Sequence, residues 1–192
     1  MGGPAMTPRM TTCGRFAVPG VASRIRRGSE SPELFGRIWK TFESRRQEIE
    51  SVAARQVYVG VNFPTDEEGV TEYLAGMMVP AGTPSPEGLE ARTLPGGQYA
   101  VFKCPVDAIG ATYQHVFGAW LPTAAAQFDA GRAPFEEYPE NTPQQPVRLH
   151  IPVQQQPTGG ETADQNRILR RSKAFGPRED CCEVARIGYT GR

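Results

Sequence analysis

The sequence has no excess of charge of either sign. Its 192 residues include 21 Lys and Arg and 21 Asp and Glu, so the formal net charge is zero. Proteins that hold nucleic acid through its phosphates need a basic surface, and the bulk composition does not supply one. We therefore expect no direct contact with nucleic acid.

The sequence also lacks cysteines at metal-binding spacing and long apolar runs. Its four cysteines are Cys13, Cys104, Cys181 and Cys182, and none of them forms a C-x-x-C pair. Neither a zinc site nor a disulfide framework is therefore indicated. No apolar run approaches the roughly 18 residues of a membrane-spanning helix, and the first residues lack the apolar core of a signal peptide. We expect a reduced, cytoplasmic protein that uses no membrane, metal or other cofactor.

Glycine and proline, by contrast, are abundant. The chain has 21 Gly and 18 Pro, and its hydrophobic fraction is 39%. This composition is typical of a compact domain that carries polar segments. Residues 155–192 are polar, are interrupted by Gly and Pro, and show no sustained period, which predicts a disordered tail. We expect a flexible segment over residues 1–13 and one domain over residues 14–154.

The first half of this domain shows a strand, a helix and two strands. Apolar residues alternate over residues 14–26, which predicts a strand. Residues 31–54 have an apolar stripe at helical spacing, with Ser31 as a suitable N-cap. Residues 56–64 and 70–80 are typical of two strands joined by an acidic turn.

The same order returns in the second half. Residues 88–105 predict a strand, a turn and a strand, and residues 106–120 predict a helix with a second aromatic stripe. Two strands then follow, over "APFEEYPEN" and "QQPVRLHIPV". The pattern indicates two strand–helix–strand–strand units, at about residues 14–80 and 88–154.

Several short stretches carry a family resemblance. They are "FAVPGVASRI", "IWKTF", "YLAGMMVP", "LPGGQYAVF", "VFGAWLP", "PFEEYPEN" and "LHIPV". In this order and spacing they resemble the gyrase-inhibitor-like effector-binding domain, which is also found in AraC- and MerR-type multidrug-sensing activators. Stand-alone domains of this kind occur as integron cassette products.

The resemblance implies an α+β fold. Two pseudo-symmetric strand–helix–strand–strand units would form an antiparallel sheet, and two helices would form a ligand groove on it. It also implies a hydrophobic pocket with an acidic residue at its base, where the two units meet.

Glu136 is the candidate for that acidic residue. Strand alternation over residues 135–138 puts Glu136 and Tyr138 on one face, and Phe135 and Glu137 on the other. A carboxylate in an aromatic cavity is costly to desolvate, and a cation relieves this cost and is attracted to the rings. The family motif "FE-x-Y" places its acid at Glu136. A surface position for Glu136, or a role for Glu137 instead, are the alternatives.

Aromatic residues and one methionine complete the candidate site. Each could equally belong to an ordinary core, and Tyr58 gives no specific signal. The residues that we expect to line the pocket beside Glu136 and Tyr138 are Trp120, Tyr99, Tyr73, Trp39 and Met77. Two of them lie in motifs that match the family: Trp120 in "WLP" and Tyr99 in "GG-x-Y".

Three further residues bear on the chemistry of this site. Arg148 stands where many members of the family have an acid. If it faces the pocket it would pair with Glu136 or repel cations, whereas strand alternation places it toward water. His150 and His115 have no neighbour in the sequence that indicates a nucleophile, and Cys104 is expected to be an inert, half-buried thiol.

These observations favour a non-catalytic binding module. Its ligands would be amphipathic, drug-like small molecules, lipophilic cations above all, and it would act as a sensor or a sequestering protein. Only about 13 residues precede the first predicted strand, so we expect no helix-turn-helix, while a homodimer is left open. One alternative is a hydrolase of strained electrophiles that uses Glu136 as general base. The other is a protein-binding inhibitor of the gyrase-inhibitor type.

Overall fold

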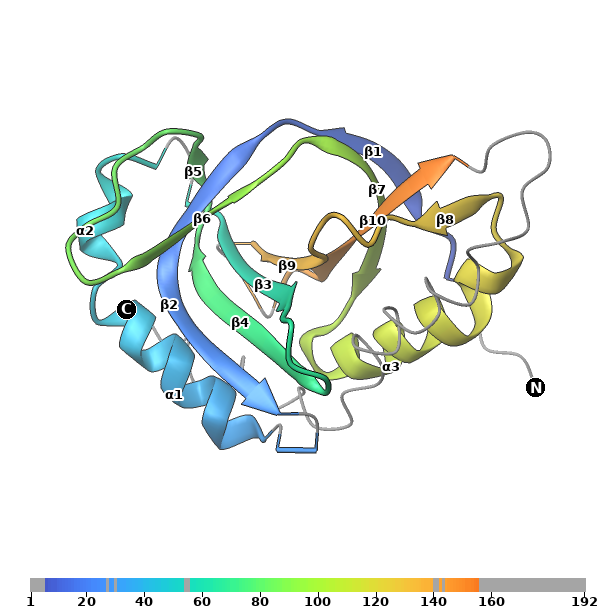
Figure 1. Cartoon of the computed structure of the whole chain (residues 1–192), viewed down its shortest axis with the longest axis horizontal. Coiled ribbons are helices and arrows are strands. Elements are labelled where there is room, and N and C mark those ends of the chain that lie inside the picture. Colours follow the sequence, from blue (N-terminus) through green and yellow to red (C-terminus); the bar gives the residue numbers. More distant parts are fainter. Residues whose placement is uncertain are drawn as a thin grey trace.

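The structure of the protein is a computed structural model. It describes residues 6–26, 28–29, 31–53, 56–139, 142 and 144–155. The segment predicted as a tail lies outside the described residues except for its first residue. Within these ranges the chain forms ten strands, and Figure 1 shows them together with the helices α1 and α3 in one compact unit.

The first unit consists of strand β2, helix α1 and strands β3 and β4, as predicted. The strands span Phe16–Arg26, Tyr58–Pro64 and Val70–Met77. Helix α1 spans Pro32–Glu43, and Ser31 caps it by accepting a hydrogen bond from the backbone N–H of Leu34 at 3.2 Å.

The predicted helix over residues 31–54 is two helices. After α1, the chain turns and forms the short helix α2, Gln47–Glu50. Ile49 of α2 is fully buried. The bend between the two helices therefore directs this apolar side chain into the core, whereas a straight helix would continue in the direction of α1.

The second unit repeats this order, with a helix that changes its winding. A short turn, η1, leads into α3, and the last residues of the predicted helix form a π-helical turn, η2, which is followed by a further turn, η3. The elements are β7 (Gly97–Cys104), η1 (Val106–Ala108), α3 (Ile109–His115), η2 (Val116–Trp120), η3 (Leu121–Thr123), β9 (Phe135–Tyr138) and β10 (Val147–Gln155).

Four strands add to the two units. Strand β1, Arg9–Cys13, pairs with β7 within the segment that the sequence predicts to be flexible. Strands β5 (Val79–Pro80) and β6 (Glu90–Leu94) pair with β2, and β8 (Ala126–Phe128) pairs with β10. The longest strands thus gain extra partners.

The strand order shows the relation between the units. It runs β1-β7-β10-β9-β3-β4-β2-β5, and every pairing is antiparallel. From the edge toward the centre, the first unit contributes β2, β4 and β3, and the second unit contributes β7, β10 and β9. In each unit this is the order first, third, second strand, and β3 pairs with β9 at the centre. This arrangement is pseudo-twofold, and the predicted α+β class with an antiparallel sheet and two helices is confirmed.

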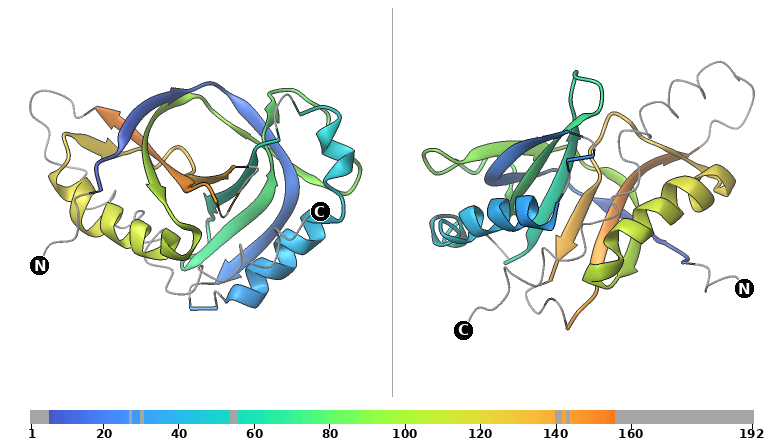
Figure 2. Two further views of the ribbon diagram at one scale, coloured as in Figure 1. Left: turned by 180° about the vertical axis from the view of Figure 1, so that it is seen from behind. Right: turned by 90° about the horizontal axis from the view of Figure 1, so that it is seen from below.

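The sheet curls, so its two faces have different surroundings. Phe135 of β9 contacts the rings of both Phe16 of β2 and Tyr99 of β7, each with centroids 5.4 Å apart. These strands are separated in the sheet order, so the contacts require an inner face that closes on itself. Figure 2 shows α1 and α3 on the outer face, with central strands visible between them in the view from below.

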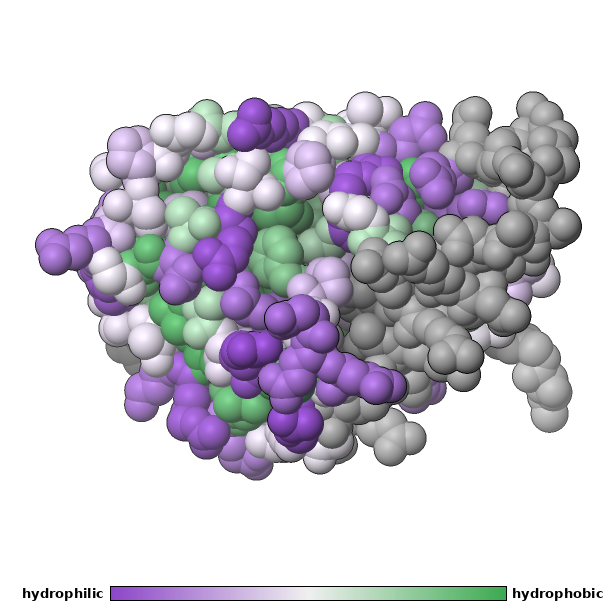
Figure 3. Space-filling model, in the orientation of Figure 1, coloured by the Kyte–Doolittle hydropathy of each residue, from purple (hydrophilic) through white to green (hydrophobic). Residues whose placement is uncertain are grey.

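The open side of the curl faces the viewer in Figure 3, where hydrophobic residues are visible between hydrophilic ones.

Within the residues that the structure describes, every helix is too short or too polar to cross a bilayer.

Candidate functional site

Glu136 lies on the outer face of the sheet, at the junction of the two units. Its strand, β9, pairs with β3 so that Glu136 stands opposite Gly60, and Tyr138 stands opposite Tyr58. The Glu136 side chain belongs to the face that the helices cover, and the residue is 1% exposed. A charged group so deeply buried needs hydrogen-bond donors around it.

The donors come from both units. Glu136 Oε1 accepts hydrogen bonds from Asn62 Nδ2 at 3.1 Å and Tyr113 Oη at 3.0 Å, and Oε2 accepts from Tyr73 Oη at 3.3 Å and Tyr138 Oη at 3.4 Å. These donors are three phenols and an amide, so they stabilise the carboxylate without neutralising its charge.

Helix α1 adds an outer layer to this arrangement. Trp39 donates its indole N–H to Tyr73 Oη at 3.1 Å, and its ring meets the ring of Tyr138 edge to face at 5.1 Å. Phe35 meets Tyr73 edge to face at 4.9 Å. We call Glu136, Tyr73, Tyr113, Tyr138, Asn62 and Trp39 together the Glu136 cluster.

Gly60 provides the space for the carboxylate. A Cβ atom at this position would collide with Tyr73 Oη and Glu136 Oε2. The Tyr73 hydroxyl, from β4, and the Glu136 carboxylate, from β9, both lie over Gly60 of β3, and only a residue without a side chain leaves room for them. The position is therefore as much part of the site as its donors.

The structure brings together three of the predicted aromatic residues. Tyr138, Tyr73 and Trp39 all belong to the Glu136 cluster. Met77 is fully buried on the same face, opposite Tyr58 in the register of β3 and β4. It packs in the core that supports the cluster.

Trp120 lies elsewhere. Its ring meets Phe102 of β7 edge to face at 5.1 Å, and β10 separates β7 from the strand of Glu136. Trp120 lines a separate cavity of about 530 Å³, together with residues of β1 such as Met10 and Thr11. The change to π-helical winding at Val116–Trp120 accompanies this placement.

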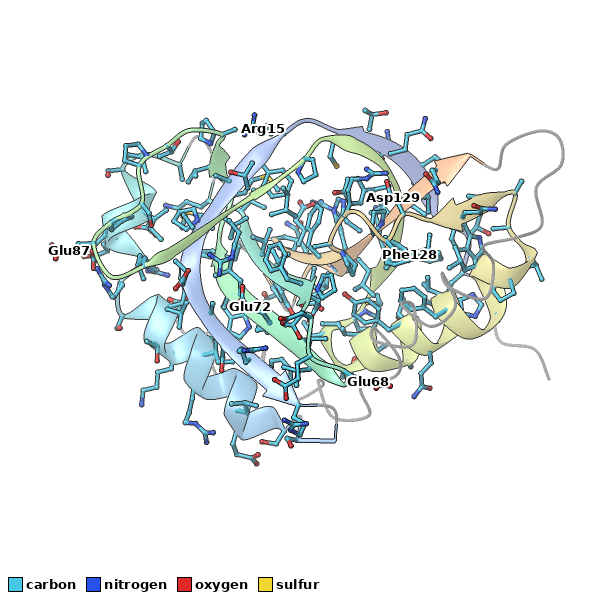
Figure 4. All side chains as sticks on the ribbon, in the orientation of Figure 1. Arg15, Glu68, Glu72, Glu87, Phe128 and Asp129 are labelled. Atoms are coloured by element: carbon cyan, nitrogen blue, oxygen red, sulfur yellow. The ribbon has the colours of Figure 1, made fainter. Side chains whose placement is uncertain are left out.

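Tyr99 lies on the opposite face of the sheet. It is fully buried inside the curl, where its ring meets Phe135 and has the guanidinium of Arg132 at 5.0 Å. Asp129, labelled in Figure 4, accepts a hydrogen bond from Arg132 at 2.8 Å and so holds that guanidinium in place. The sequence motif around Tyr99 thus marks a core position and not a neighbour of Glu136.

Strand alternation at residues 135–138 is as the sequence predicts. Glu137 points into the curl, where it forms an ion pair with Arg148 and a hydrogen bond with His150 Nε2 at 2.8 Å. Burial raises the pKa of the Glu137 carboxyl, but the hydrogen bonds and charges of His150 and Arg148 outweigh it and hold the pKa below its ordinary value of 4.5. Arg148 therefore pairs with Glu137 and not with Glu136.

Two members of the cluster are absent from the sequence-based set. Asn62 interrupts the apolar residues of β3 and shares the face of Tyr58 and Gly60. A polar residue among the apolar ones of this strand was therefore the feature of the sequence that could have identified Asn62 as a site residue. Tyr113 lies within the apolar stripe of α3, where a phenol is indistinguishable from a core ring without the fold.

The described part of the chain contains no group of three or more His, Cys, Asp and Glu side chains that could hold a metal ion. Cys104 is buried, at 2% exposure, where a half-buried thiol was expected.

A family comparison matches most of the chain. The model of a family described as "integron-associated effector binding protein" matches residues 9–153. The transcriptional regulator BrlR of Pseudomonas aeruginosa is 29% identical over 133 residues, which cover 66% of this chain and 48% of BrlR. The chain therefore spans about half the length of this curated relative.

Solved structures share the fold at low sequence identity. SAV2435 bound to tetraphenylphosphonium has a TM-score of 0.61 and 14% identity, with 78% of this chain and 94% of that chain covered. An integron cassette protein of Vibrio cholerae has a TM-score of 0.53 and 16% identity, with 77% and 96% covered. At these identities the likeness concerns the fold alone.

Proposed function

Because the chain belongs to the integron-associated effector-binding proteins, we propose that it binds amphipathic small molecules, lipophilic cations above all, at the Glu136 cluster. The observation that supports this proposal most directly is a buried carboxylate held by three phenols and an amide. As a sensor or sequestering protein it would act without chemical change to the ligand.

The physical argument concerns what an incoming cation gains. The donors around Glu136 leave its negative charge in place, so a cation near it gains a strong attraction in a site of low polarity. Trp39 and Tyr138 now pack edge to face against each other, and once they separate their ring faces can attract the same cation. A ligand with aromatic groups around its charge also buries apolar surface against these rings.

Access to Glu136 passes through the outer rings. Trp39 is 8% exposed and Tyr138 is 7% exposed, whereas Glu136 is 1% exposed. We therefore expect a ligand to enter between α1 and α3 by displacing Trp39 from Tyr138. The relative SAV2435 was solved with tetraphenylphosphonium, a cation surrounded by four phenyl rings, and a ligand of this type fits the requirement.

A thermal-shift experiment tests the proposal. Tetraphenylphosphonium should raise the Tm of the wild-type protein, and the free energy of stabilisation should grow with the logarithm of ligand concentration, reaching about 2.7 kcal/mol at 100 times Kd. Glu136→Gln should lose this shift. Tetraphenylborate, an anion of the same shape, should give no shift to either protein.

The adjacent acid provides a matched control. Glu137→Gln removes one charge from the same strand on the opposite face, so it should keep the response to tetraphenylphosphonium. If tetraphenylborate stabilises the protein as strongly as the cation, the ligand class is wrong. If Glu136→Gln keeps the full cation response, the ligand lies outside the Glu136 cluster.

A further inference from the structure

A second group of reactive side chains lies inside the curl, away from the Glu136 cluster. Cys13, at the end of β1, has its Sγ 3.9 Å from His150 Nδ1, and His150 Nε2 is 2.8 Å from Glu137 Oε2. The three side chains come from β1, β10 and β9, so only the sheet pairing brings them together. In the sequence Cys13 and His150 are 137 residues apart.

These residues line a groove at one end of the curl. The groove has a volume of about 570 Å³ and includes Cys13, His150 and Glu137 in its wall. Figure 4 labels Arg15 at the turn between β1 and β2, beside this groove. Most of its other walls are apolar: Phe16, Val57, Met78, Val79, Pro80 and Phe135.

The hydrogen bond to Glu137 determines which nitrogen of His150 is free to act. An ionised carboxylate only accepts hydrogen bonds, so a neutral His150 must carry its proton on Nε2. Nδ1 is then the unprotonated nitrogen, and it is the one that faces Cys13 Sγ. Stacking on Phe135, at 4.2 Å between centroids and 11° between planes, holds the imidazole in this orientation.

Glu137 would also stabilise a charged imidazole. The carboxylate has its pKa held down by His150 and Arg148 against the effect of burial, so it stays ionised at neutral pH. A negative charge in contact with Nε2–H favours the imidazolium that forms when Nδ1 takes a proton.

We propose that Cys13, His150 and Glu137 form a thiol site that captures apolar electrophilic small molecules covalently. Cys13 is the nucleophile, His150 is the general base, and Glu137 orients His150 and stabilises its charged form. Because the two nitrogens of His150 point to different partners, the three groups do not converge on one point as metal ligands would.

The chemistry for an α,β-unsaturated carbonyl compound is balanced without a further reactant. Cys13 Sγ forms a bond to the β-carbon, its proton moves to His150 Nδ1, and the electrons of the carbon–carbon double bond shift to the carbonyl as an enolate. The proton then passes from Nδ1 to the α-carbon. The product is a thioether, and His150 returns to its neutral form.

The resting state of Cys13 makes the base necessary. Burial, and then the negative charge of Glu137, raise the pKa of the thiol above 9.0, and Arg132 lowers it in part. At neutral pH the group is therefore a thiol, and a thiol reacts slowly until its proton is removed. General-base assistance typically contributes 10²- to 10⁴-fold.

The test is the rate of modification by N-phenylmaleimide, followed on the full chain by mass spectrometry of tryptic peptides. Cys13, Cys104 and the pair Cys181–Cys182 fall in three different peptides, so each is measured in the same sample. At pH 7 Cys13 should react faster than the cysteine of a synthetic peptide of residues 10–15. A rate equal to or below that of the peptide would overturn the proposal.

Variants of the two histidines distinguish general-base assistance by His150 from simple exposure of the Cys13 thiol. His150→Ala should slow the modification of Cys13 by at least about tenfold and leave the peptide of Cys181 and Cys182 unchanged. His115→Ala removes the other histidine, which is outside the groove, and should have no effect. An unchanged rate in His150→Ala, with a melting curve like that of the wild type, would rule out His150 as the base.

The dependence on pH and on concentration adds two readouts. The charged and titratable groups that face this histidine are Cys13, Glu137, Arg148 and, over Tyr99, Arg132. In His150→Ala the rate should rise only as the thiol itself ionises, whereas the wild-type rate at pH 7 should already exceed it through general-base assistance. The rate should also saturate with N-phenylmaleimide, and a strictly linear dependence would mean that the groove does not bind the reagent.

Discussion

Glu136 and Glu137 are neighbours in the chain and have opposite surroundings. Successive side chains of a strand point to opposite faces, so one carboxylate lies under the helices among phenols and the other lies inside the curl beside Arg148 and His150. This alternation separates the proposed cation site from the proposed thiol site, although the two glutamates are adjacent in the chain.

At Gly60 the site depends on an absent side chain. We expect Gly60→Ala to displace Tyr73 Oη and the Glu136 carboxylate, because the new Cβ would collide with both. Overpacking of this kind costs about 1–3 kcal/mol of unfolding free energy, and the shift caused by tetraphenylphosphonium should also fall. Urea denaturation and thermal shift measure the two effects.

Gly36→Ala is the matched control for that substitution. Gly36 lies in α1, and a Cβ added there would have no neighbouring atom within 4 Å. Alanine should therefore be neutral at this position or add about 0.5–1 kcal/mol of stability. If both variants lose the same stability, the collision in the cluster is not the cause.

Glu137 makes the stability depend on pH in the acid range. Its pKa is lower in the folded protein than its ordinary value of 4.5, so the folded state binds this proton less tightly than the unfolded state does. The contribution is complete above about pH 4.5 and is lost as the pH falls through the folded pKa. Glu137→Gln should therefore reduce the loss of stability between pH 6 and pH 3.

Denaturation by urea at both pH values measures this difference. Glu68→Gln changes an exposed carboxylate in the turn between β3 and β4, labelled in Figure 4, and should keep the acid sensitivity of the wild type. An equal pH dependence in Glu137→Gln and wild type would contradict the ion-pair argument.

At the scale of elements, α1 holds the outer wall of the Glu136 cluster. It supplies Trp39 and begins at a side-chain cap, Ser31. Loss of such a cap costs about 1 kcal/mol, so Ser31→Ala should lower the free energy of unfolding by about this amount and weaken the response to tetraphenylphosphonium.

Ser31→Asp keeps an acceptor at the N-cap and should restore both properties in the same urea and thermal-shift measurements. If Ser31→Ala lowers stability and leaves the cation response untouched, then α1 supports the fold without forming the wall of the site.

The elements also differ in how well the sequence predicts them. The six strands of the two units and the start of α1 are predicted because they combine apolar alternation, helical spacing and a clear cap. Strands β1 and β8 are not predicted, because they are short and show no apolar alternation of their own. The two residues of β5 belong to the single strand predicted over residues 70–80, which the structure divides into β4 and β5. Such short segments become strands only because a longer neighbour offers unpaired backbone groups.

At the scale of the whole molecule, the two units share one site. Asn62 and Tyr73 come from the first unit, and Tyr113, Glu136 and Tyr138 come from the second. Strands β3 and β9 join the units in one sheet. The first unit supplies two of the four donors to a carboxylate that the second unit carries, so we expect both units to unfold together.

The two tryptophans of the chain test this cooperativity, because Trp39 lies in the first unit and Trp120 in the second. Trp39→Phe leaves only Trp120, and Trp120→Phe leaves only Trp39. In each variant the urea transition seen by tryptophan fluorescence should coincide with that seen by far-UV circular dichroism. A midpoint that differs between the two probes would show that the units unfold separately.

The sequence by itself predicted the strand–helix–strand–strand repetition and the alternation that puts Glu136 and Glu137 on opposite faces of a strand. Both follow from periodicity along the chain, which is local information, whereas the class of fold and the pocket beside Glu136 came from the family resemblance. It also named Tyr138 because alternation puts it on the face of Glu136, Tyr73 through the family resemblance, and Trp39 because it lies in the aromatic stripe of the first predicted helix.

Only the tertiary structure decided which residues meet across the sheet. The strand order placed Trp120 and Tyr99 away from Glu136, added Asn62 and Tyr113 to it, and brought Cys13 to His150. Each of these outcomes depends on strand order, curl and register, which are set by the simultaneous packing of the whole chain and leave no pattern within any one segment.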